Sequence, residues 1–301
     1  MFRGETMVED VKSRLKQLQA AIDSLYIQEN DHLTVLIDSN ELHELRSCSK
    51  LLVAMAMGIA INHRLFSLDE EVYPYFERYV TNRRNIEKIK KWTIRTLLTH
   101  TTGYDKMLLK NKDLEELDSK KLVEYVLNYN IENDVNTTFV YNNVEPFLIS
   151  VLFYEKHHID LEEFIKINIF DPLDIKDYQW EKYGEYCPGG TGAFLFPKDF
   201  HKLGLLILNY GKYHNYQVVP SAWISEMSKI QIETPSMTKK GRVFPKYYAG
   251  YYMFISRDGF IFRDGYHGQY LLIHREKNLL ISIMSSEKDN GNATEMFRGI
   301  L

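Results

Sequence analysis

Residues 47–61 read SCSKLLVAMAMGIAI, and this stretch decides the fold. A helix that is apolar on every side is normally buried, so the segment predicts a helix inside the molecule. Ser47 and Lys50 lie three residues apart at its start and therefore share one face of a helical turn. The amine can act as the base that a weak serine nucleophile needs. The helix dipole places positive potential where an acyl-transfer oxyanion would form.

The S-x-x-K spacing alone is weak evidence, because it occurs at four serines of this chain. Ser13 lies in a charged amphipathic segment, Ser236 in a polar stretch that contains proline, and Ser285 at the end of an apolar strand. Only Ser47 opens a helix that is apolar all round. The alternative for Ser47 is an ordinary helix N-cap, since serine is favoured there. The motif by itself leaves these two interpretations equally open.

The composition is that of a soluble globular protein. The chain has 301 residues, of which 45% are hydrophobic and 26% charged, enough for a large core and room for two subdomains. A net charge of -4 gives no sign of a nucleic-acid partner. The basic run 83–91 is interrupted by Asn85, Ile86, Glu87 and Ile89, and reads more simply as a solvated helix face.

Cysteine and targeting signals are sparse. Cys48 and Cys187 do not suggest a disulfide framework, and Cys48 reads as a small packing residue beside Ser47. The longest apolar run, residues 51–61, is too short to cross a bilayer. The first 25 residues carry charges throughout and do not resemble a signal peptide. We therefore expect no membrane span and a cytoplasmic location, with a trimmed export signal as the alternative.

The order of the expected elements predicts an α+β fold, with an antiparallel sheet built from both chain ends and flanked by helices, and a mostly helical insertion. Residues 1–62 and 187–301 form the sheet subdomain, residues 63–186 the helical one, and the active site lies between them. The expected helices are 8–26, 93–100, 119–129, 144–156, 161–170, 198–210 and a short one from 220; the expected strands are 33–37, a short one before residue 47, 247–256, 260–264, 269–275 and 279–286.

A second candidate element is Tyr141-Asn142-Asn143, at the junction between a polar loop and an apolar helix. A tyrosine hydroxyl can carry a proton if a nearby lysine ammonium lowers its pKa. The carboxamide of Asn143 can orient that lysine and a substrate carbonyl. The alternative is a packed aromatic residue beside a turn asparagine.

A third candidate is Arg263-Asp264-Gly265-Tyr266, at the end of one expected strand, with His267 leading into the next. A cation on an edge strand beside a glycine suits a substrate groove. The glycine admits close approach, and the following backbone N–H can donate to an oxyanion. The alternative is a plain hairpin turn with an Arg–Asp pair on the surface.

Taken in order over about residues 30 to 290, these motifs resemble the serine β-lactamase and penicillin-binding-protein-like superfamily, in particular class C β-lactamases, DD-peptidases and family VIII carboxylesterase-like serine hydrolases. Residues 93–103, TIRTLLTHTTG, are very similar to the family signature T-I-R-x-L-L-T-H-T-S-G. Ser47 to Lys50 resembles the nucleophile motif, and Tyr141 to Asn143 the Y-x-N element. Residues 170–173 resemble the F-x-P-L turn, and residues 189–227 a glycine loop with its following helices.

The resemblance implies a serine hydrolase that works through an acyl-enzyme. Ser47 would be the nucleophile, Lys50 and Tyr141 would share acid–base work, and Asn143 would orient Lys50 and the substrate. Backbone N–H groups of Ser47 and Tyr266 would form the oxyanion hole. No metal or organic cofactor is implied.

Two histidines lie in or near these motifs. His100, together with Thr102, would brace the fold rather than react. His267 is kept as a substrate-contact candidate.

The third element departs from the family pattern, which is usually K-T-G or H-x-G. Asp264 would put a carboxylate where β-lactams and D-alanyl peptides carry theirs, and like charges repel strongly in a groove of low dielectric. Unless Arg263 neutralises Asp264, we therefore expect a small-molecule or peptide-like ester or amide substrate of neutral or cationic character. The alternatives are a true β-lactamase or DD-peptidase, and a non-catalytic binding or sensor protein that keeps the fold.

Overall fold

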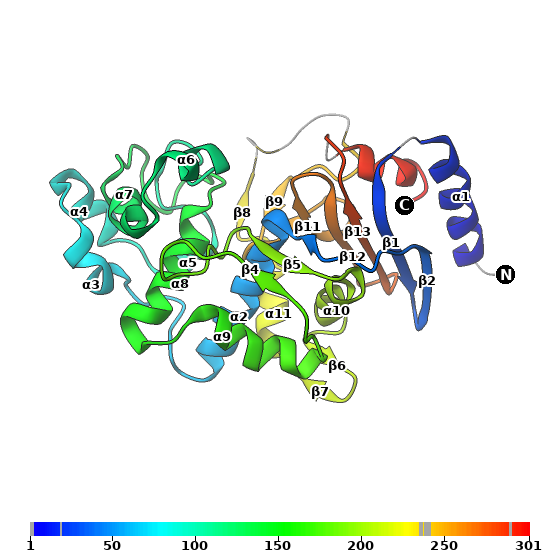
Figure 1. The fold of residues 1–301 in the computed structure, drawn as a ribbon, viewed down its shortest axis with the longest axis horizontal. Coiled ribbons are helices and arrows are strands. Elements are labelled where there is room, and N and C mark those ends of the chain that lie inside the picture. The colour runs from blue at the N-terminus through cyan, green and yellow to red at the C-terminus, as the bar shows by residue number, and fades with distance from the viewer. Residues whose placement is uncertain (1–2, 19, 235–236, 238–241, 289–290) are drawn as a thin grey trace.

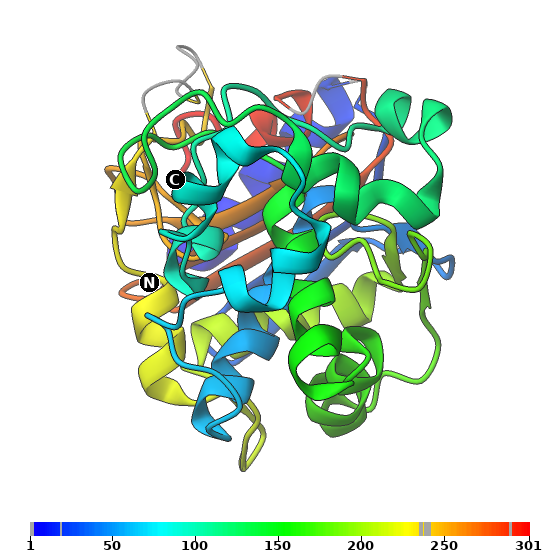
Figure 2. The same cartoon turned by 90° about the vertical axis from the view of Figure 1, so that its left-hand side faces the viewer.

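The computed structural model describes residues 3–18, 20–234, 237, 242–288 and 291–301. Figure 1 shows a large sheet at one end of the molecule and a group of helices at the other, with helix α2 between them. Figure 2, turned by 90°, looks onto the helical end. The site residues considered below come from both ends, so this arrangement positions them.

The main sheet joins the two ends of the chain. Its eight strands follow the order β2-β1-β13-β12-β11-β10-β9-β8, and all neighbours are antiparallel. This confirms the predicted α+β class. The strands are β1 (Ile22–Glu29), β2 (His32–Ile37), β8 (Ile232–Glu233), β9 (Tyr248–Ala249), β10 (Phe254–Ile255), β11 (Ile261–Gly265), β12 (Gln269–His274) and β13 (Leu279–Ser285).

Both faces of the sheet are covered. Leu271 and Leu280 belong to the core on one face, under α10 (Pro197–Leu208). Leu272 and Ile281 belong to the core on the other face, which α1 (Arg3–Gln17) and the 3-10 helix η7 (Asn292–Phe297) cover. Strands buried on both faces are apolar throughout rather than alternating, which explains the continuous apolar runs of β12 and β13.

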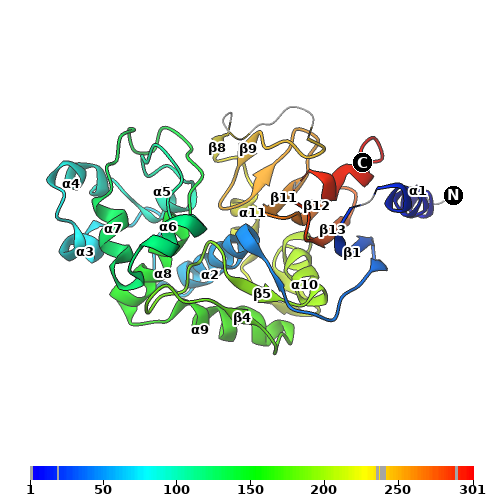
Figure 3. The same cartoon turned by 45° about the horizontal axis from the view of Figure 1, so that its top comes forward.

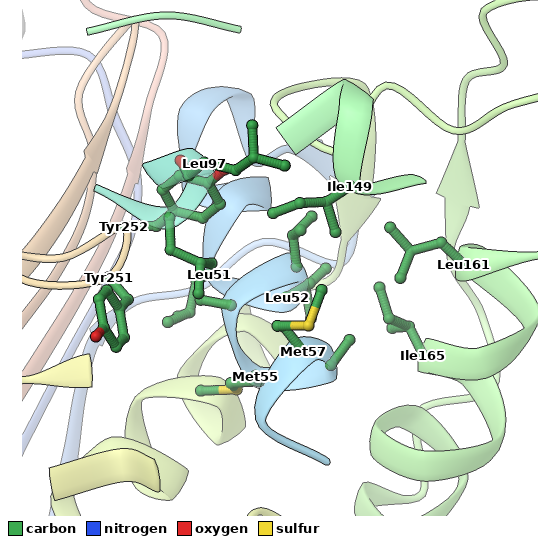
Figure 4. Close-up of a cluster of buried hydrophobic side chains, with 14 of the residues drawn as sticks. Leu51, Leu52, Met55, Met57, Leu97, Ile149, Leu161, Ile165, Tyr251 and Tyr252 are labelled. Carbon is green, nitrogen blue, oxygen red and sulfur yellow. Dashed lines mark hydrogen bonds between the residues drawn. The ribbon is translucent and has the colours of Figure 1, made fainter. Parts of the chain in front are cut away.

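Helix α2 (Lys50–Asn62) is the core of the molecule, and its residues 50–60 are all buried. Figure 4 shows Leu161 and Ile165 of α9 packed on one side of α2, and Tyr251 and Tyr252 on the sheet side. The prediction of a helix buried all round is confirmed.

The packing of α2 on α11 (Ser221–Met227) depends on one glycine. A Cβ at Gly58 would lie 2.0 Å from Cδ1 of Trp223. The indole N–H of Trp223 donates to the carbonyl of Ala54 at 2.8 Å. The backbone of α2 at Gly58 therefore packs directly against the Trp223 ring of α11.

The predicted helices in the insertion are present, and Figure 3 shows them grouped on one side of α2. The division of the chain at residues 62 and 187 stays a prediction. The helices are α3 (Tyr73–Phe76), α4 (Arg83–Ile89), α5 (Ile94–Leu98), α6 (Asn111–Glu116), α7 (Leu122–Asn128), α8 (Val144–His157) and α9 (Leu161–Ile165), which continues as a π-helix over Lys166–Phe170. Two small sheets complete the fold: β3 (His43–Glu44), β5 (Ala193–Leu195) and β4 (Gln179–Trp180), and β6 (Lys212–Tyr213) with β7 (Tyr216–Gln217).

Two predicted elements are wrong. The helix expected over 8–26 ends at Gln17, and residues 22–29 form β1 between β2 and β13. Its residues 24–27 are buried consecutively, as in a strand covered on both faces. Asn30, with φ 54°, closes the hairpin to β2.

The single strand expected over 247–256 is a hairpin, because the chain turns back over residues 250–253 and Gly250 N–H donates to Met253 O at 2.9 Å. Gly250 is required there, since a Cβ would lie 2.1 Å from the carbonyl oxygen of Met227. Within the described residues, no helix combines the length and the apolar character needed to cross a membrane.

Candidate active site

Ser47 lies in a 3-10 turn, Arg46–Ser49, that leads directly into α2. The N-cap of α2 is Ser49, so the alternative interpretation of Ser47 as that cap is wrong. Arg46 has a positive φ of 50°, an uncommon conformation for a residue other than glycine. The end of β11 packs against this turn, because a Cβ at Gly265 would lie 2.6 Å from the carbonyl oxygen of Leu45. Gly265 therefore allows the sheet and the turn that contains Ser47 to meet.

Lys50 is fully buried and its amine is held from two sides. Nζ donates to Oδ1 of Asn143 at 2.6 Å and to the carbonyl of Gly190 at 3.1 Å. The carboxamide of Asn143 is fixed in this orientation because its Nδ2 donates to the carbonyl of Leu109 at 3.0 Å. Burial, and then the charge of Arg263, lower the pKa of Lys50 well below its usual value. The lowered pKa favours the neutral amine, which is the form that can accept a proton.

Tyr141 joins Lys50 and Ser47. The amine of Lys50 lies 4.9 Å from the centroid of the Tyr141 ring, and the Ser47 side chain acts on the Tyr141 hydroxyl in the direction that lowers its pKa. Arg263 Nη2 donates to the same hydroxyl at 2.5 Å. Burial raises the pKa of Tyr141, and the opposing effects of Arg263 and the Ser47 side chain offset this increase only in part. The sequence predicts proton transfer by Tyr141 if a nearby lysine ammonium lowers its pKa, and this condition is not met: the pKa is raised, so the phenol keeps its proton near neutral pH and is suited to relay a proton.

Arg263 is a buried clamp. It is 1% exposed, and besides Tyr141 it donates through Nε to the carbonyl of Ser47 at 2.9 Å and through Nη1 to that of Tyr252 at 3.3 Å. Strand β11 lies between β12 and β10, but its pairing with β10 involves only Ile261 and Phe262. The alternative of a surface Arg–Asp pair is therefore wrong, while a substrate-groove role for Arg263, whose part of β11 is not paired with β10, stays a prediction.

Asp264 is neutralised by a residue that the sequence analysis missed. Lys246 Nζ lies 2.7 Å from Oδ2 of Asp264, and the two side chains are 19% and 9% exposed. The same ammonium lies 4.4 Å from the centroid of the Phe254 ring. The carboxylate therefore does not stand uncompensated beside the site, although its partner is Lys246 and not Arg263.

The hairpin between β11 and β12 carries the two remaining candidates. The Tyr266 side chain is 59% exposed, and its ring centroid lies 4.2 Å from that of His267. His267 Nδ1 donates to the carbonyl of Glu287 at 2.9 Å, which holds the imidazole at the hairpin. Substrate contact by this pair, and the oxyanion role of the backbone N–H groups of Ser47 and Tyr266, stay predictions.

Comparison with known proteins identifies the family. The family model described as Beta-lactamase matches residues 29–301. The chain belongs to the beta-lactamase family. Among solved structures, this family member is similar to the hydrolase EstCE1, described as having promiscuous acyltransferase activity (11% identity, 99% of this chain and 98% of that chain covered, TM-score 0.78). It is also similar to a penicillin-binding protein from Bacillus halodurans (14%, 99% and 98%, TM-score 0.72).

A third similar structure is a class C beta lactamase from Rhodobacter sphaeroides (13% identity, 98% and 97% covered, TM-score 0.73). At such identities the likeness to solved structures shows the fold, and it confirms the predicted architecture. No curated protein sequence matches this beta-lactamase-family chain.

Behind the site, the protein contains a buried polar cluster formed by His100, Thr102 and Glu145. Thr102 Oγ1 donates to Oε1 of Glu145 at 2.6 Å, and Nδ1 of His100 lies 3.0 Å from Oε2. All three side chains are buried. Glu145 was not singled out from the sequence, although it is the one charged residue of the run 144–153. A charge in such a run is the signal that could have found it, since carboxylates are rarely fully buried unless paired.

The other nucleophile candidates lie elsewhere. Ser13 is exposed on α1, Ser285 Oγ donates to the carbonyl of Ala21 at 2.9 Å, and Ser236 lies outside the described residues. Cys48 is buried and burial raises the pKa of its thiol, so it is a packing residue, as expected. In the part of the chain that the structure describes, no three His, Cys, Asp or Glu side chains are grouped as metal ligands.

Proposed function

We propose that the protein is a serine hydrolase that acts on an ester or amide through an acyl-enzyme on Ser47. One observation carries the proposal: the amine of Lys50, with its lowered pKa, is held by Asn143 and Gly190 at 4.9 Å from the centroid of the Tyr141 ring, and it follows Ser47 by three residues at the start of α2. A buried neutral amine one turn from a serine is the base that a serine nucleophile requires.

In the proposed reaction, Ser47 Oγ bonds to the acyl carbon while its proton passes to Lys50, directly or through the Tyr141 hydroxyl. The carbonyl electron pair moves to oxygen, and backbone N–H groups of Ser47 and Tyr266 donate to that oxyanion. The bond to the leaving group then breaks, and the leaving group takes the proton from Lys50. Water repeats the sequence on the acyl-enzyme and releases the acid.

A true β-lactamase or DD-peptidase is the second candidate, and the pair between Lys246 and Asp264 favours it. The expectation of a neutral or cationic substrate rested on an uncompensated Asp264. With Lys246 at 2.7 Å the carboxylate is balanced, so a substrate that carries its own carboxylate is not repelled by a net negative charge.

The experiment is labelling by a fluorophosphonate together with turnover of 4-nitrophenyl butyrate. Ser47→Ala is expected to abolish both, while Ser13→Ala, which removes an exposed serine of the same S-x-x-K spacing, serves as the matched control. Activity that persists in Ser47→Ala would remove Ser47 from the mechanism.

Two further measurements separate the subclasses. Nitrocefin turnover that exceeds butyrate turnover would support the β-lactamase candidate over the esterase. A stable adduct in the intact mass, without turnover, would support a sensor protein.

A further inference from the structure

The buried cluster behind the site carries a negative charge that its own partners do not cancel. Glu145 accepts one hydrogen bond from the hydroxyl of Thr102 and one from the imidazole of His100. Because the carboxylate accepts, Nδ1 of His100 carries the proton of that bond. Burial lowers the pKa of His100, so the ring is neutral near pH 7. Both partners are therefore neutral, and the pair as a whole keeps one negative charge.

The cluster faces the site through aromatic rings. The imidazole of His100 lies 5.2 Å from the Tyr141 ring and 4.9 Å from the Tyr252 ring, centroid to centroid. Nε2 of His100 is buried and has no hydrogen-bond partner among the described residues. A buried ring nitrogen without a hydrogen-bond partner destabilises the folded state, and such atoms are uncommon in proteins. A structural role alone therefore does not account for His100, which points to a further role for the cluster.

Positive charge lies beside the same Tyr141 ring, because the guanidinium carbon of Arg263 is 5.4 Å and Nζ of Lys50 4.9 Å from its centroid. Arg263 is buried, and its hydrogen bonds within the described residues go to three neutral oxygens, on Ser47, Tyr141 and Tyr252. When Lys50 takes up the proton of Ser47, a second cation forms beside Arg263. Two enclosed cations repel each other unless a buried anion offsets them.

We propose that Glu145 is a positioning residue of the acyl-transfer site: its buried carboxylate stabilises the protonated Lys50 that forms during acylation, and it holds His100 against the Tyr141 ring. The inference rests on the proposed function of Ser47. The charged and titratable groups that face Lys50 are Cys48 from the nucleophile turn, Arg263 and Asp264 from β11, Glu145 from α8, and Tyr141 and His100 from the loops before α8 and after α5. Among them, Glu145 raises the pKa of Lys50 the most, followed in the same direction by Cys48 and Asp264.

The test is the pH dependence of fluorophosphonate labelling in Glu145→Gln, which keeps the size of the side chain and removes its charge. Loss of a nearby negative charge favours the neutral amine, so the acid limb of the profile is expected to move down by on the order of one pH unit. The plateau rate falls several-fold, because a less basic amine is a weaker proton acceptor.

The matched control is Glu155→Gln, which removes a carboxylate from the same helix about 15 Å away. Glu155 accepts hydrogen bonds from Arg78 and Tyr79, and neither residue belongs to the site. The acid limb of the labelling profile of this variant is expected to coincide with that of the wild type. If Glu145 had a purely structural role, Glu145→Gln would change the thermal stability and leave the pH of the acid limb unchanged.

A folded Glu145→Gln protein whose limb coincides with that of the wild type would overturn the proposal. If Glu145→Gln does not fold, the paired variant His100→Asn/Glu145→Gln replaces the buried pair by two amides, and asparagine tolerates the positive φ of 55° at position 100. Its limb must move in the same direction. If wild-type protein is not labelled, or is labelled equally after Ser47→Ala, the proposed function fails instead, so the two failures are distinguishable.

Discussion

Replacing Lys246 by methionine should lower kcat/KM for substrates that carry a negative charge. The ammonium of Lys246 lies 2.7 Å from Asp264, and without it the carboxylate stands alone beside the clamp residue Arg263. A substrate carboxylate about 6 Å from Asp264 is then repelled by roughly 3 kcal/mol at an effective dielectric constant of about 20. That energy corresponds to about a hundredfold loss in kcat/KM. A neutral substrate of the same shape is not affected by this repulsion.

The assay compares mono-4-nitrophenyl succinate with 4-nitrophenyl butyrate, which differ mainly by one carboxylate, at pH 8 and low ionic strength. The ratio of the two kcat/KM values should fall about a hundredfold in Lys246→Met and recover in Lys246→Met/Asp264→Asn, because the second change removes the unpaired charge. Added salt should reduce the difference. A ratio within twofold of wild type in the folded single variant would refute the reasoning.

Three further predictions concern stability. Lys50→Met should abolish turnover yet raise the melting temperature near pH 7. Because the pKa of Lys50 is lowered in the folded state, the stability of the wild-type protein rises with pH up to about 10.5. Thermal melts at increasing pH should therefore show that the difference in melting temperature between variant and wild type becomes smaller toward that pH. Burial lowers the pKa of His201 from 6.5 to about 4, so wild-type stability should fall by about 3 kcal/mol as pH drops through that window, and urea titrations of His201→Gln should show a flatter decline. Gly58→Ala places a methyl group 2.0 Å from the Trp223 ring and should cost about 1–3 kcal/mol in chemical denaturation, and unchanged stability would contradict the close packing of α2 on α11.

Much of the fold was predictable, because apolar periodicity reports burial directly. Residues 51–61 predict the central helix, and the runs at 269–275 and 279–286 predict two adjacent strands of the main sheet. The failures have local causes. Leu18, Ile22 and Leu25 continue a helical spacing into β1, a strand covered on both faces, where alternation is absent.

The candidate site was predictable where its chemistry is local in sequence. Ser47 and Lys50 are one turn apart, and Tyr141 and Asn143 flank one residue. Lys246 could not be found in this way, because an ion pair across a loop and a strand leaves no spacing pattern. The orientation of Arg263 was equally hidden, since a single strand does not reveal which face its side chain takes until the neighbouring strands are known.

The clamp formed by Arg263 also has a consequence for protein synthesis. The guanidinium of Arg263, which donates to the carbonyl of Ser47, lies 216 residues further along the chain. Strand β1 likewise waits for β13 before it gains its second neighbour. Ser47 is therefore synthesised well before Arg263 and β13, so the proposed acyl-transfer site is assembled only after these later residues have left the ribosome.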